Sequence, residues 1–124
     1  MPREIMSGLS RRDERYLEIA SNLAKSSDAG RYKHGAIIVK GGRVLSTGIN
    51  KFKNHPNIFE NKSIIKQKAH IHAEADAIRK AGDLKGATIY VARINKTGNT
   101  GLSRPCNYCY EKIIEAGITK IVYT

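Results

Sequence analysis

The two cysteines of this chain lie three residues apart, and this spacing constrains the fold more than any other feature of the sequence. Cys106 and Cys109 are the only cysteines among 124 residues, and Pro105 precedes them at the expected start of a helix. Cysteines one helical turn apart face the same way and can hold a metal ion or form a redox pair. Two thiols do not complete a metal site, so a metal site requires a fold that brings further ligands to this helix.

A second expected helix begins with a residue that can complete such a site. His72, Ala73 and Glu74 open an alanine-rich helical segment. One imidazole and two thiolates suit zinc, and they are one ligand short of a closed structural site, which leaves a position for water. Glu74 would take the proton of a zinc-activated water and deliver it to a substrate nitrogen, as hydrolytic removal of an amino group requires. His70, two residues before His72, is the alternative ligand.

The rest of the sequence alternates helical patterns with short apolar runs. A run rich in β-branched residues, the Gly41-Gly42 pair and a second short run together predict a hairpin. The polar, basic segment 49–69 predicts a long loop that borders the site, and 95–103 predicts a second loop. The order of elements predicts helices on the faces of one mixed sheet, whose last strand is parallel to the third. The expected elements are helices 13–24, 72–81 and 105–116 and strands 35–39, 43–47, 87–92 and 118–123.

Length and composition limit the class of protein. With 40% hydrophobic and 27% charged residues, the chain has room for one globular domain, expected to span 1–124. No apolar run approaches the roughly 20 residues of a membrane span, so we expect no signal peptide, no membrane anchor and a cytoplasmic protein. The formal net charge is +11, and residues 30–72 hold nine basic residues against one acid. Such a region favours phosphate-bearing ligands, although a solvated lysine-rich loop has the same composition.

The arrangement His-x-Glu followed by Pro-Cys-x-x-Cys is the signature of zinc-dependent nucleobase deaminases. On these motifs, on residues 34–39 and 48–50 of the hairpin, and on residues 113–123, the chain resembles the cytidine and deoxycytidylate deaminase superfamily. Within it, the chain is most similar to small deoxycytidylate (dCMP) deaminases. The resemblance implies a three-layer α/β/α sandwich. The family core usually adds a helix and a fifth strand after the position of Tyr123, so we expect about four strands here, in the order 2-1-3-4, with the last strand at an open edge.

The resemblance also implies roles for individual residues. Asn50 is expected to hydrogen-bond the sugar, and the backbone N–H of Ala73 is expected to hold the pyrimidine carbonyl. Arg104 departs from the family, which often has Ser or Glu at this position; we expect it to hold a phosphate, with a solvent-exposed loop arginine as the alternative. The zinc ligands implied are His72, Cys106 and Cys109, with Glu74 as the proton shuttle.

These inferences favour a zinc hydrolase that deaminates a cytosine ring on a free nucleotide, converting dCMP to dUMP; adenine and guanine are the alternative bases. One alternative is a deaminase of single-stranded nucleic acid or tRNA, with the basic region 30–72 as its groove, although aromatic residues are few there. Another is a catalytically idle zinc-bearing module that binds nucleotides or a protein. Glu74 argues against this, because a structural site has no use for a proton shuttle. An open edge strand also predicts a homo-oligomer whose neighbour helps to wall the pocket.

Overall fold

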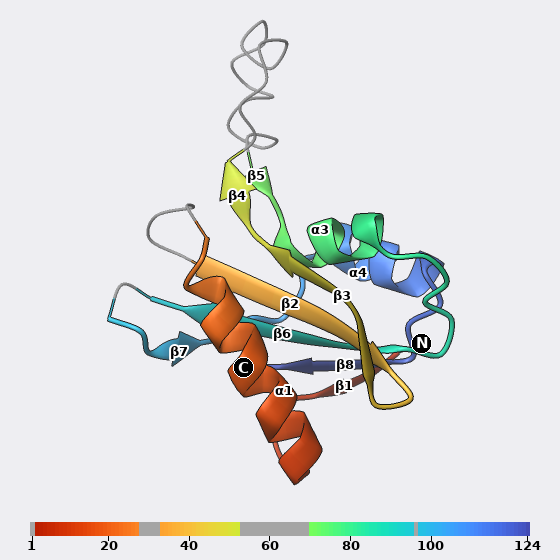
Figure 1. The fold of residues 1–124 in the computed structure, drawn as a ribbon, viewed down its shortest axis with the longest axis horizontal. Coiled ribbons are helices and arrows are strands. Elements are labelled where there is room, and N and C mark those ends of the chain that lie inside the picture. Colours follow the sequence, from red (N-terminus) through yellow and green to blue (C-terminus); the bar gives the residue numbers. More distant parts are fainter. Residues whose placement is uncertain (1, 28–32, 53–69, 96) are drawn as a thin grey trace, which may run out of the picture.

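A mixed β-sheet with helices on both faces forms the framework of the chain (Figure 1). The computed structural model describes residues 2–27, 33–52, 70–95 and 97–124. The elements in chain order are β1 (Arg3–Ile5), α1 (Arg11–Ala24), β2 (Lys33–Lys40), β3 (Arg43–Ile49), β4 (Lys51–Phe52), β5 (His70–Ile71), α3 (Ala73–Lys80), β6 (Thr88–Ile94), β7 (Thr100–Gly101), α4 (Asn107–Glu115) and β8 (Lys120–Tyr123). Helix α1 covers one face of the sheet, and α3 and α4 cover the other, which confirms the α/β/α class.

The strands of the main sheet run in the order β1-β8-β6-β2-β3, and β7 pairs with β6 off this path. Strand β2 is antiparallel to both β3 and β6, whereas β6 and β8 are parallel. The predicted order 2-1-3-4 is therefore confirmed as β3-β2-β6-β8, with the last strand parallel to the third. Strands β3, β6 and β8 all point the same way, so their carboxyl ends lie at one edge of the sheet.

Two expectations about the extent of the sheet were wrong. The last strand is not at an open edge, because β1 pairs with β8 in parallel. The segment 95–103 is not all loop either, because β7 pairs with β6. Strands of three and two residues are too short to show an alternating pattern, so only tertiary pairing reveals them. The sheet consequently has six strands and not four.

The central strand β2 divides the core into two parts. Its buried residues alternate, with Ala36 and Ile38 facing α3 and α4, and Ile37 and Val39 facing α1. Each face of the sheet therefore carries its own apolar cluster, and burial of β2 on both sides accounts for its continuous apolar sequence. Among the described residues, none of the helices has the length and apolar character needed to cross a bilayer.

A buried carboxylate ties α1 to the sheet on the face away from α3. Ser10 caps the helix by accepting a hydrogen bond from the Asp13 N–H at 3.1 Å. The Asp13 carboxylate accepts hydrogen bonds from the Tyr90 hydroxyl at 2.7 Å and from the Lys120 ammonium at 3.2 Å. Burial alone would raise the pKa of Asp13, but these two partners hold it below its ordinary value.

Candidate metal centre and active site

The structure brings His72, Cys106 and Cys109 together from the starts of two helices. His72 is the N-cap residue of α3 and Cys106 that of α4, and neither side chain caps its own helix. Instead the side chains meet: His72 Nδ1 lies 3.6 Å from Cys106 Sγ and 3.3 Å from Cys109 Sγ. The three ligand atoms all lie within 4.8 Å of one another, so they can hold one ion.

The donor set and its spacing fit zinc. With Zn–S near 2.3 Å and Zn–N near 2.0 Å, a tetrahedral site places nitrogen and sulfur about 3.5 Å apart. The observed separations of 3.3 and 3.6 Å lie on either side of this value. Burial first, and then the charges of Glu74 and Cys106, raise the pKa of Cys109 above its usual range, so a thiolate there calls for a bound cation. Because Cys109 is buried and Cys106 exposed, the site is open on one side.

Glu74 stands beside this cluster in the first turn of α3. Its side chain is 5% exposed, and the Cys109 thiol donates a hydrogen bond to it. Burial raises the pKa of Glu74 above its ordinary value, although hydrogen bonds from its own backbone and from Cys109 partly oppose this. A carboxylate that contacts a thiol of the cluster can exchange protons with a group bound at the metal's open side.

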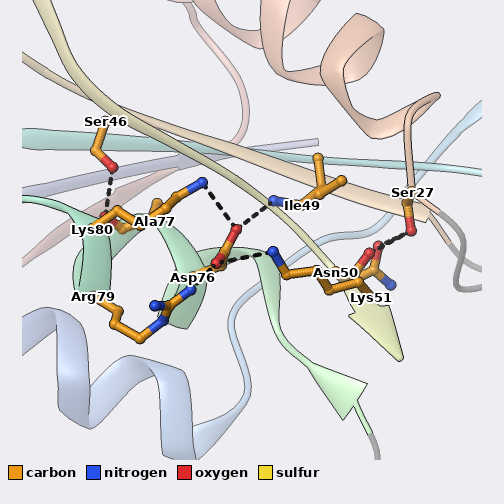
Figure 2. Close-up of polar contacts among 9 residues, drawn as sticks. All are labelled: Ser27, Ser46, Ile49, Asn50, Lys51, Asp76, Ala77, Arg79 and Lys80. Carbon is orange, nitrogen blue, oxygen red and sulfur yellow. Dashed lines mark hydrogen bonds and ion pairs between the residues drawn. The ribbon is translucent and has the colours of Figure 1, made fainter. Parts of the chain in front are cut away.

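Asn50 follows β3 directly and is buried (Figure 2). Its Oδ1 accepts a hydrogen bond from the His34 N–H at 2.8 Å, and its Nδ2 lies 3.3 Å from His34 Nδ1. The Ser27 hydroxyl lies 2.6 Å from Oδ1 and 2.6 Å from the backbone oxygen of Asn50, and it donates to one of them at a time. The amide of Asn50 is therefore held in one orientation at the edge of the sheet where β3 ends.

Helix α3 lies directly on β3, and a glycine permits this close approach. A Cβ at Gly48 would overlap the backbone of Ala73 and Ala77. Ala73 is the first residue of α3, where backbone N–H groups have no partner within the helix. The structure thus places the predicted carbonyl-binding N–H of Ala73 between His72 and Glu74, at the start of the helix.

The hydrogen bonds of Arg104 are made with β1 and not with the cluster of His72, Cys106 and Cys109. Its Nε is 2.8 Å from Glu4 Oε1 and its Nη2 is 3.3 Å from Glu4 Oε2, so the guanidinium binds both oxygens of the Glu4 carboxylate on β1. This ion pair raises the pKa of Arg104 and holds the loop before α4 to the first strand. Contact between Arg104 and a substrate phosphate stays a prediction.

Of the basic region 30–72, residues 30–32 and 53–69 lie outside the described part of the chain.

Comparison with known proteins identifies the family. The sequence profile of the cytidine and deoxycytidylate deaminase zinc-binding region matches residues 10–124. The chain belongs to this family. It is therefore a zinc-dependent deaminase, as the sequence resemblance implied. It is also 33% identical, over 128 aligned positions, to a deoxycytidylate deaminase of Mycobacterium phage D29, an alignment that covers 90% of this chain and 92% of the phage protein.

Solved structures of two deaminases share the fold. The dCMP deaminase of cyanophage S-TIM5 matches with a TM-score of 0.62 at 24% identity, covering 93% of this chain and 84% of that protein. A guanine deaminase from Bacillus subtilis matches with a TM-score of 0.58 at 23% identity, covering 94% of this chain and 64% of that one. Proteins named for different bases thus share this fold, so the fold alone does not select the base.

Asp76 was missed by the sequence analysis, although it is the most deeply buried charged residue among those described. Its side chain has no exposed surface, and burial alone would raise the pKa of Asp76. Hydrogen bonds from Arg79 and Lys80 reverse this and hold the pKa below its ordinary value. One signal was available: Asp76 shares a helix face with Ala73 and adjoins Ala77, both of which are buried.

Proposed function

We propose that this deaminase converts dCMP to dUMP. Water adds to C4 of the cytosine ring, and the exocyclic amine leaves as ammonia. The observation that carries the proposal is the buried Glu74 carboxylate in contact with a His72, Cys106 and Cys109 cluster that fits zinc. Likeness to a phage deoxycytidylate deaminase along 90% of the chain supports dCMP as the substrate. The related cyanophage enzyme was solved in complex with dCMP and dUMP.

The residues of the chain divide the work of this reaction. His72, Cys106 and Cys109 would hold zinc, which would supply an activated water when bound. Glu74 accepts one proton from the attacking water and delivers it to ring N3, and it then moves the proton of the new C4 hydroxyl to the amine, which leaves as ammonia. The Ala73 N–H holds the pyrimidine carbonyl. Because Asn50 Oδ1 already accepts hydrogen bonds within the protein, we expect its Nδ2 group to donate to a sugar oxygen.

A substrate panel tests the proposal. We expect purified protein to release ammonia from dCMP, and to do so weakly or not at all from nucleosides, dCTP, guanine, adenosine nucleotides and single-stranded oligonucleotides. Because one phosphate carries at most about two charges, added salt should weaken dCMP binding only modestly. The rate of deamination is measured from the ultraviolet change, at salt concentrations from about 50 to about 200 mM. Unlabelled oligonucleotide is added as the competitor.

The nucleic-acid alternative gives the opposite outcome in the same experiment. A polymer engages several phosphates and releases several counterions, so its affinity falls steeply with salt. Efficient deamination of an oligonucleotide beside inert dCMP would overturn the proposal. In that case, changing Lys51, Lys53, Lys62 and Lys66 together would abolish turnover on the oligonucleotide.

We propose further that the protein is a homo-oligomer in which a neighbour helps to wall the pocket. Strand β3 is an edge strand of the sheet, and its Val44 and Leu45 side chains are exposed. Tyr108, at the rim of the metal cluster, is 59% exposed. Its ring packs edge-on against that of His72, with 6.4 Å between the ring centroids. Burying such surfaces between copies would remove apolar area from water. Light scattering at micromolar concentration should give a mass well above 13.7 kDa, and a monomer mass would contradict the proposal.

A further inference from the structure

Four donors converge on the buried carboxylate of Asp76 (Figure 2). Two come from its own helix: Arg79 Nη2 lies 2.8 Å from Oδ1, and Lys80 Nζ lies 3.2 Å from Oδ2. The other two come from the strand side: the Ile49 N–H lies 3.4 Å from Oδ2, and Lys51 Nζ lies 3.5 Å from Oδ1. A fully buried charge needs such partners, because desolvation otherwise disfavours it.

The two contacts from the strand side flank one residue. Ile49 is the last residue of β3 and Lys51 the first of β4, so Asp76 binds the chain immediately before and immediately after Asn50. Arg79 and Lys80 alone could neutralise the carboxylate from within α3, at spacings of three and four residues. The contacts to Ile49 and Lys51 are therefore additional, and they join the helix to the strand end.

Further contacts hold β3 against α3 up to this point. The Ser46 hydroxyl donates a hydrogen bond to the Ala77 carbonyl at 2.6 Å, and Gly48 allows the two backbones to touch. Contacts between β3 and α3 therefore run along the strand from Ser46 through Gly48 to Ile49, where Asp76 binds the backbone next to Asn50. Since Glu74 stands two residues before Asp76 on the same helix, the carboxylate links the segment that carries Asn50 to the helix that carries Glu74.

We infer that Asp76 is a positioning residue, which sets the place of Asn50 relative to Glu74 by binding the chain on both sides of Asn50. The inference rests on the proposed function, which assigns the sugar contact to Asn50. The His34 backbone N–H and the Ser27 hydroxyl orient the Asn50 amide, and Asp76 holds the adjoining backbone through the Ile49 N–H. Loosening this backbone should weaken sugar binding more than it slows proton transfer, because Glu74 and the zinc ligands keep their places.

Steady-state kinetics of Asp76→Asn, with two matched controls, test the inference. We expect D76N to raise KM for dCMP about 5- to 10-fold, the scale of one ordinary hydrogen bond lost, while kcat changes less than about 3-fold. Arg79→Gln removes the shortest ion pair of Asp76 but no contact to the strand, so KM should stay within about 2-fold. Asp13→Asn alters a buried, ion-paired carboxylate on the opposite face, so it should lower the melting temperature without changing KM.

Nuclear magnetic resonance provides a readout that needs no turnover. The side-chain amide peaks of Asn50 should shift in D76N and remain in place in R79Q and D13N. Should D76N not fold, Asp76→Glu takes its place, since it keeps the charge but moves the carboxylate relative to the Ile49 N–H. Unchanged Asn50 peaks, or equal shifts in R79Q, would overturn the inference. If the wild type does not deaminate dCMP, the proposed function is wrong. The Asn50 peaks would still show whether Asp76 positions Asn50.

Discussion

A Glu74→Gln variant will keep its fold and its zinc but will lose at least about 100-fold in kcat on dCMP, the usual scale for a positioned acid or base. Glutamine has nearly the same shape and volume, so it fits the buried position of Glu74, yet its amide cannot take up and pass on a proton. The site therefore stays assembled while its proton carrier is lost. Measurements are initial rates, elemental analysis of zinc and a thermal melt monitored by circular dichroism.

The matched control is Glu111→Gln, which makes the same change on an exposed face of α4. It should leave rate, zinc content and melting temperature near those of the wild type. Near-full activity of E74Q would show that Glu74 is not the proton shuttle. Loss of zinc together with activity would instead assign Glu74 a part in building the site.

The parts of the site that the sequence predicted are those specified by local chemistry. Pro105 and Gly117 indicate the start and the end of a helix through their local backbone preferences. Cysteines three residues apart on a helix face the same way. The order of helices and strands then requires the helices to lie on the faces of the sheet, and this brings His72 to the cysteines. The structure confirms the strand order and places these three residues in one cluster.

The parts that the sequence did not predict depend on contacts between distant segments. Strand β1 consists of three residues whose pairing with β8 joins the two ends of the described chain. Arg104 resembles a phosphate-binding residue in the sequence, but the structure pairs it with Glu4, a hundred residues away. Asp76 has partners on β3 and β4 that no helical periodicity indicates. Each of these pairings requires tertiary structure, which residue patterns within one element do not encode.

Removing both thiols will abolish zinc binding. We expect the wild type to carry one zinc ion per chain and the Cys106→Ala, Cys109→Ala double variant to carry essentially none, because a single imidazole from His72 cannot hold the ion against water. Turnover should fall below detection, since no activated water is then supplied. Elemental analysis after gel filtration, combined with the dCMP assay, measures both effects.

Chelation of the wild type separates loss of the metal from damage to the core, because Cys109 is fully buried and its truncation leaves a small cavity. A chelator should abolish activity and lower the melting temperature, since an ion that binds only the native state stabilises it. Added Zn²⁺ should restore both, whereas Mg²⁺ should not, because two thiolates and an imidazole disfavour hard cations. Full zinc retention in the double variant, or undiminished activity in the chelated wild type, would rule out this metal centre.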